Sequence, residues 1–148
     1  MKQMTLDEAR QAIADICAAG LDGREFVSRL GPGRVAYACN GCGPASWPEE
    51  RREKLDKWLS TFRLAFDVHD CRFTYGDRSH AKFRAANDEL RENCLILADE
   101  KYAWWNPLRY LARNRAHLIA LLCQEFGWNA WMDACNKSHN KKTERIEL

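Results

Sequence analysis

The amino-acid sequence predicts an all-α fold. Apolar residues recur every three or four positions over most of the chain, helix-capping residues precede these stretches, and the alternation typical of strands is almost absent. We expect two long antiparallel helices, at about 50–75 and 79–99, with N-terminal and C-terminal helices packed around them. Residues 1–135 are expected to form a single domain, and 136–148 a polar C-terminal tail.

The N-terminal part is expected to contain short helices followed by a loop. Thr5 and Glu8 have the spacing of a capping box ahead of the first helix, and Gly20 is a typical end for it. A second short helix is expected over Arg24–Leu30. The segment Ala36–Pro44 is expected to be a loop, because its glycines and proline do not sustain a helix.

Each of the two long helices carries one continuous apolar stripe. The first stripe contains a histidine and consists of Leu55, Leu59, Phe62, Phe66, His69 and Phe73. The second stripe contains an asparagine and consists of Phe83, Asn87, Leu90, Cys94 and Leu97. Asn106-Pro107 breaks the chain again, and Leu108–Phe126 reads as a further amphipathic helix that Gly127 ends. A short segment at 128–135 follows.

Composition excludes several classes of protein. The formal net charge is +2, from 23 basic and 21 acidic residues, which is too even for nucleic acid as the main partner. No window is long and apolar enough to span a bilayer, and the acidic, amphipathic N-terminus is unlike a signal peptide. We therefore expect cytoplasmic synthesis, and the seven cysteines are expected to be thiols rather than a disulfide framework.

Two features have the residue types needed for chemistry. One is the glycine-rich loop at 40–44, and the other is the pair His69-Asp70 within the predicted helix at 50–75. His69 faces the apolar stripe, and Asp70 points about 100° to one side of it. A carboxylate and an imidazole buried together are costly unless both are satisfied. A bound cation for Asp70 and a hydrogen-bond partner for His69 would satisfy them.

Three segments stand in an order that resembles a known family. They are CNGCGP (Cys39–Pro44), FRLAFDVHDCRFTYG (Phe62–Gly76) and ANDELRENC (Ala86–Cys94), and WWNPLRY (Trp104–Tyr110) adds to the likeness. Together they resemble the phospholipase A2 superfamily, in particular its short, cysteine-poor members from bacteria and prophages. The resemblance covers roughly residues 37–110.

The resemblance implies a phospholipase A2-like helical domain that hydrolyses the sn-2 ester of a phospholipid with Ca²⁺. His69 is then the general base that accepts a proton from the attacking water. The side chain of Asp70 and the backbone carbonyls of Cys39, Gly41 and Gly43 are then the calcium ligands, all of them oxygens. The ion and the Gly41 amide are then expected to stabilise the oxyanion.

The sequence departs from the family pattern at three places. Phe73 stands where the family has a tyrosine, although Tyr75 is nearby. Secreted members of the family flank the His-Asp pair with disulfide cysteines, whereas here only Cys71 lies close to the pair. The family orients its histidine with an aspartate of the next helix. Helical phase favours Asn87 at that place, whereas Asp88 lies about 100° round the helix. Both residues remain candidates.

The expected partner is a phospholipid or membrane surface, as substrate. An enzyme made without an export signal needs another route to lipid, and release on lysis or association with a virion would provide one. No oligomeric state is predicted.

Two other functions are compatible with the same residues. The departures at Asn87 and Phe73 favour a catalytically inactive phospholipase A2-like structural or interaction protein. Cys39-x-x-Cys42 is also half of a zinc site in a zinc-stabilised nucleic-acid-binding module, with further ligands drawn from Cys71, Cys94 or His80. A redox pair of Cys39 and Cys42 lacks the surrounding βαβ pattern.

The aromatic residues and the tail leave further alternatives. Two uses are open for Trp104-Trp105 and the segment Trp128–Trp131: core packing or contact with a lipid interface. Core packing is favoured, because these residues flank amphipathic helices. The lysine-containing tail Asn136–Arg145 suits either free solvation or contact with anionic lipid.

Overall fold

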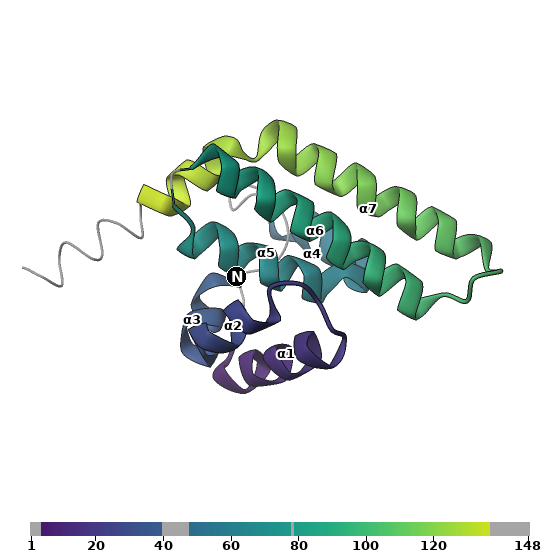
Figure 1. Cartoon of the computed structure of the whole chain (residues 1–148), viewed down its shortest axis with the longest axis horizontal. Helices are drawn as coiled ribbons and strands as arrows, with labels where there is room; N and C mark the ends of the chain where they lie inside the picture. Colours follow the sequence, from purple (N-terminus) through teal and green to yellow (C-terminus); the bar gives the residue numbers. More distant parts are fainter. Residues whose placement is uncertain (1–3, 40–47, 78, 137–148) are drawn as a thin grey trace, which may run out of the picture.

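The computed structural model describes residues 4–39, 48–77 and 79–136 of the chain (Figure 1). Every regular element within these ranges is a helix, which confirms the predicted all-α class. In chain order the elements are α1 (Leu6–Ala18), α2 (Arg24–Leu30), α3 (Pro32–Ala38), α4 (Glu49–Trp58), the 3-10 turn η1 (Ser60–Phe62), α5 (Arg63–Tyr75), α6 (His80–Lys101) and α7 (Pro107–Phe126). Residues 128–136 are helical as well.

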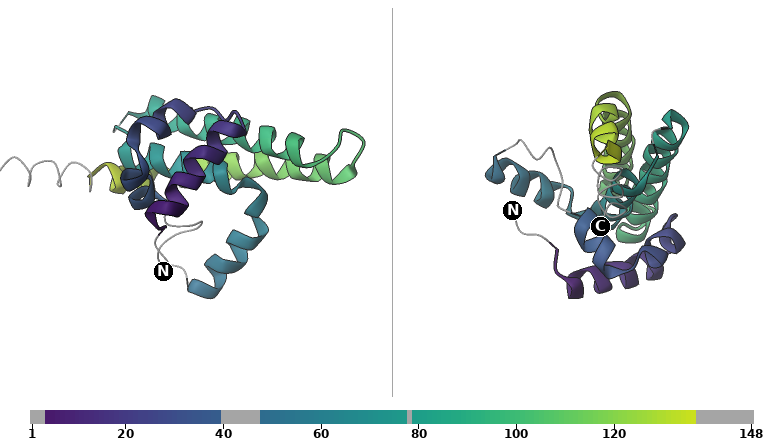
Figure 2. Two further views of the ribbon diagram at one scale, coloured as in Figure 1. Left: turned by 90° about the horizontal axis from the view of Figure 1, so that it is seen from below. Right: turned by 90° about the vertical axis from the view of Figure 1, so that its left-hand side faces the viewer.

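The helices are stacked in an order that places α5 at the centre. The two longest, α6 and α7, lie side by side and run in opposite directions, α5 packs against α6, and α1–α3 cover α5 from the other side (Figure 1). Their shared core contains Ile16, Leu21, Val27, Val35 and Val68. α4 projects to one side of this stack (Figure 2) and buries none of its residues.

The N-terminal helices follow local signals in the sequence. Both hydrogen bonds of the capping box form between Thr5 and Glu8, and Ala9, Ala12 and Ile16 face the core at helical spacing. Gly31, with a φ of 77°, turns the chain between α2 and α3, a conformation that favours glycine. Of the expected loop at 36–44, residues 36–38 are helical instead, because Pro32 starts a helix that continues through Ala38, and residues 40–44 lie outside the described residues.

The predicted helix at about 50–75 is two helices. It ends at Trp58, continues through the 3-10 turn Ser60–Phe62, and starts again as α5. Leu59 and Phe62 turn into the core at this break and are 5% and 2% exposed. The apolar stripe hides the break because a 3-10 turn also spaces its residues by three.

The remaining predicted helices match the structure closely. α6 begins after Ser79, whose hydroxyl accepts a hydrogen bond from the Lys82 N–H, and α7 begins at Pro107. The five residues of the second predicted stripe are all buried in α6. None of the described helices combines the length and hydrophobicity that a membrane span requires.

Candidate functional site

His69 lies on the face of α5 that packs against α6. Its side chain is buried, with 7% of its surface exposed. Contacts pair His69 with Asn87 and Phe73 with Phe83, so later residues of α5 meet earlier residues of α6, as in an antiparallel pair. The imidazole also packs on the ring of Phe73, with ring centroids 4.3 Å apart.

A hydrogen bond from α6 fixes the orientation of the His69 ring. Nε2 of His69 lies 2.9 Å from Oδ1 of Asn87, and Nδ2 of Asn87 donates to Oε1 of Gln124 on α7 at 3.1 Å. Because the Asn87 amide donates to Gln124 through its nitrogen, its oxygen faces the imidazole and accepts from Nε2–H. Three helices therefore contribute to one polar chain, His69–Asn87–Gln124.

This arrangement leaves His69 neutral, with its free lone pair on Nδ1. Burial lowers the pKa of His69 to about 4, against a smaller raising effect from the hydrogen bond to Asn87. A neutral imidazole that donates through Nε2 can accept only through Nδ1, and no described residue bonds to Nδ1. Such a ring can take a proton from a molecule placed beside Nδ1.

Asp88, the other predicted orienting residue, does not reach His69. Its side chain is 69% exposed on the outer side of α6, and its carboxylate lies 3.5 Å from Arg91. Helical phase had favoured Asn87, and the structure places Asn87 at the ring.

The tyrosine that the family resemblance calls for is also absent from the site. The Tyr75 hydroxyl donates to the backbone carbonyl of Arg34 on α3, so it points away from His69. Phe73 fills the space beside the imidazole with an apolar ring, and Trp131 meets that ring edge-on at 4.9 Å.

Asp70 lies beside a second acidic residue that sequence reasoning missed, Asp67. Burial raises the pKa of Asp70 well above its ordinary value, and the charge of Asp67 raises it further. Asp67 is 4% exposed; burial raises the pKa of its carboxyl too, although Arg63, 3.5 Å away, acts in the opposite direction. Two carboxylates one helical turn apart thus lie beside one arginine, Arg63, which is paired with Asp67 and lowers the pKa of both.

The described part of the expected calcium site consists of the Asp70 side chain and the end of α3 at Cys39. Carboxylate oxygens are ligands that calcium prefers, but no three His, Cys, Asp or Glu side chains among the described residues are grouped so that they could hold a metal ion. Gly41 and Gly43, whose carbonyls were expected to complete the site, lie outside the described residues. Cys39 ends α3 in an extended conformation and leads into that segment.

The zinc alternative finds no support among the described residues. No three His, Cys, Asp or Glu side chains within the described ranges are grouped as metal ligands. The Cys39 thiol is buried and donates to the backbone carbonyl of Asp67, His80 lies on the surface against Trp128, and Cys42 lies outside the described ranges. Contact with Cys71, followed by burial, raises the pKa of Cys39, which disfavours the thiolate that zinc needs.

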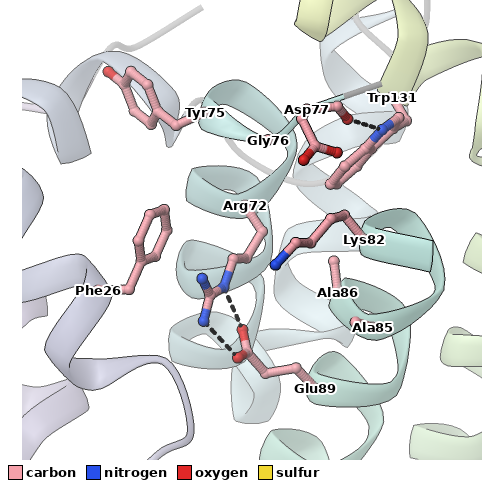
Figure 3. A pocket seen from close by; sticks show the side chains of 10 residues that line it. All are labelled: Phe26, Arg72, Tyr75, Gly76, Asp77, Lys82, Ala85, Ala86, Glu89 and Trp131. Carbon is pink, nitrogen blue, oxygen red and sulfur yellow. Dashed lines mark hydrogen bonds and ion pairs between the residues drawn. The ribbon is translucent and has the colours of Figure 1, made fainter. Parts of the chain in front are cut away.

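A hollow of about 350 Å³ lies on another side of α5 and α6 (Figure 3). Arg72 crosses its wall to form two hydrogen bonds with Glu89 and stacks over the ring of Phe26, 4.1 Å from its centroid. Trp131 closes one end and donates to the backbone carbonyl of Asp77. His69 and Asp70 are not among the residues that line this hollow.

Two residues of the site were not predicted from the sequence. Asp67 precedes Asp70 by three positions, a spacing that puts two side chains on one helix face and could have indicated a shared site. Gln124 comes from α7 and reaches Asn87 only through the packing of α7 on α6, so no local pattern marks it.

Comparisons with protein-family models, with curated proteins and with solved structures find no match to this chain.

Proposed function

We propose that the chain is a calcium-dependent, phospholipase A2-like hydrolase that cleaves the sn-2 ester of a phospholipid, with His69 as the general base. The observation that carries the proposal is the 2.9 Å hydrogen bond between His69 Nε2 and Asn87 Oδ1. The antiparallel pair α5 and α6 plays the part of the two site helices of that superfamily. The substrate is a phospholipid or a membrane surface.

The residues of the chain divide the work between proton transfer and substrate binding. Nδ1 of His69 accepts the proton of the attacking water, a step that general bases accelerate roughly 10²–10⁴-fold. Oδ1 of Asn87 keeps the ring oriented and stabilises the imidazolium less strongly than a carboxylate does. The pKa of about 4 keeps His69 unprotonated at neutral pH, so Nδ1 is available to accept, but burial makes the ring a weaker base than a free imidazole.

Asp70 is proposed to hold the calcium ion, with Asp67 adding negative charge beside it. The backbone carbonyls of Cys39, Gly41 and Gly43 complete the proposed ligand set. When bound, calcium supplies positive charge that polarises the ester carbonyl. Asp67 and Asp70, whose pKa values burial has raised, would both be favoured in the carboxylate form beside a bound cation.

The proposal is tested by the release of fatty acid from phospholipid vesicles with calcium and with a calcium chelator. His69→Ala is expected to abolish release, and Asp70→Asn to weaken calcium binding measured by calorimetry. Asp88→Asn is the matched control, because Asp88 neighbours Asn87 but points away from His69. Release that persists in His69→Ala, or that calcium does not affect, would refute the assignment.

A second candidate, an inactive phospholipase A2-like interaction protein, is favoured by two observations. His69 is only 7% exposed, and its partner Asn87 carries no charge. This candidate predicts no fatty-acid release from the wild type. Asn87→Asp separates the two functions further, since a carboxylate at that place stabilises the imidazolium and should raise the rate of an active enzyme.

A further inference from the structure

Gln124 occupies the far end of the polar chain that leads to His69. It lies in the last turn of α7 and continues the face that packs on α6, one and two helical turns after the buried residues Ala120 and Ala116. Among the hydrogen bonds of the described residues, the link from Gln124 to His69 runs through Asn87. Any influence of α7 on the imidazole by hydrogen bonding therefore passes through one buried amide.

The side-chain amide of Asn87 has a direction. One end is an acceptor oxygen and the other a donor nitrogen, but the two ends have nearly the same size, so packing does not decide which end faces His69. The hydrogen-bond partner at the other end decides it. Gln124 presents its carbonyl oxygen, and Nδ2 of Asn87 donates to this oxygen at 3.1 Å. The donor end of Asn87 is thereby turned towards α7, and the acceptor end towards His69.

The neutral imidazole of His69 responds to this direction. Each of its tautomers carries the hydrogen on one ring nitrogen and a lone pair on the other. Nε2 faces Oδ1 of Asn87 at 2.9 Å and so carries the hydrogen, which leaves the lone pair on Nδ1. A reversed Asn87 amide would present an N–H to Nε2, and the hydrogen of the ring would then be on Nδ1.

Reversal of Asn87 is costly while Gln124 presents an oxygen. Oδ1 of Asn87 would then face Oε1 of Gln124, two acceptors with no hydrogen between them, inside a region where Asn87 is only 2% exposed. A buried polar group left without a partner shifts such an equilibrium by about ten- to a hundredfold. The carbonyl of Gln124 is thus strong enough to select one tautomer of a ring on another helix.

We propose that Gln124 is a positioning residue that sets the tautomer of His69 through Asn87. The choice of tautomer follows from the hydrogen bonds alone, and only its effect on hydrolysis rests on the proposed function. With the hydrogen on Nδ1, His69 has no lone pair to offer the attacking water at that atom. For comparison, an imidazole held in the wrong tautomer in a Ser-His-Asp protease lowers kcat about 10⁴-fold.

The test is which ring nitrogen of His69 carries the hydrogen, read from a proton–nitrogen NMR correlation of the imidazole. The full chain is measured at neutral pH in a calcium chelator, as wild type, Gln124→Glu and Gln124→Lys. Glutamate has the shape of glutamine, and its carboxylate only accepts, so the hydrogen should stay on Nε2 as in the wild type. Lysine only donates, so it should reverse Asn87 and raise the ratio of the Nδ1–H to the Nε2–H tautomer at least about tenfold.

Leu121→Lys is the matched control for the added charge. Leu121 lies on the same helix and is 56% exposed, so a lysine there adds the same charge in water without a reason to turn the Asn87 amide. The tautomer of His69 should not change in this variant. A role of Gln124 in filling space alone would leave the tautomer the same in Gln124→Lys as well.

Hydrolysis supplies a second and separate measurement. Fatty-acid release should be at least about tenfold slower in Gln124→Lys than in Gln124→Glu, through kcat rather than KM. If no variant releases fatty acid but the tautomers differ as expected, the proposed hydrolysis fails and the role of Gln124 stands. The same tautomer in Gln124→Glu and Gln124→Lys, or a wild type that carries the hydrogen on Nδ1, would overturn the role of Gln124.

Discussion

Replacing Asn87 with leucine removes the central member of the His69–Asn87–Gln124 chain. Asn87 is 2% exposed and makes both of its side-chain hydrogen bonds within the protein. Leucine has a similar volume, so the main loss is polar: the buried Nε2–H of His69 loses its acceptor, at a cost of about 1–3 kcal/mol. The Gln124 amide is only partly buried and can turn to water, which adds about 1 kcal/mol. We expect a total loss of about 2–4 kcal/mol.

The assay is urea unfolding at neutral pH, with the free energy of unfolding compared at constant m-value. Asp88→Leu is the control from the same helix, and its 69% exposed side chain should change the stability by no more than about 0.5 kcal/mol. If the two variants lose the same stability, or if Asn87→Leu is neutral, the reasoning about the buried chain is refuted.

Three further predictions follow from the cited pKa shifts. The imidazole of His69 should titrate near pH 4 in a calcium-free NMR pH series, and a pKa of 6.5 or above would show that the ring is hydrated. Burial raises the pKa of Asp99, but the hydrogen bonds and charges of Arg113 and Arg109 outweigh this and lower it. The folded state therefore gains stability above the unfolded pKa of Asp99 and loses it as the pH falls through the folded pKa. In urea titrations the difference between wild type and Asp99→Asn should accordingly vanish in acid, and a difference unchanged with pH would contradict the ion pairs. Burial raises the pKa of Cys94 to about 12, so a thiol reagent should modify exposed Cys17 in the native protein and Cys94 only after unfolding; equal rates would contradict the packing.

Local signals in the sequence predict most of the helices. The Thr5–Glu8 capping box, Ser79 ahead of α6 and Asn106-Pro107 ahead of α7 satisfy or remove orphan N–H groups, and the helices begin where these residues stand. Periodicity also puts His69 and Asn87 on facing stripes, which is how the structure pairs them.

The break at Ser60–Phe62 and the reach of Gln124 could not be predicted in this way. A 3-10 turn keeps the spacing of three, so the stripe from Leu55 to Phe73 runs through the break without a visible change of period. Gln124 meets Asn87 only because α7 packs on α6. Core packing, the use that the sequence favours for Trp104-Trp105, is wrong, since these side chains are 75% and 69% exposed in the turn between α6 and α7, which projects beyond the other helices (Figure 1). The contact of Gln124 with Asn87 and the exposure of Trp104 are properties of tertiary packing, which no local sequence pattern records.

The role of His69 is tested most directly by the origin of the oxygen in the released fatty acid. Vesicles whose sn-2 chain is labelled are incubated with the protein and calcium in heavy-oxygen water. The wild type should release the labelled fatty acid with solvent oxygen in its carboxyl group, and His69→Ala should release none. Equal release by the two proteins, or a fatty acid without solvent oxygen, would contradict a water nucleophile activated by His69.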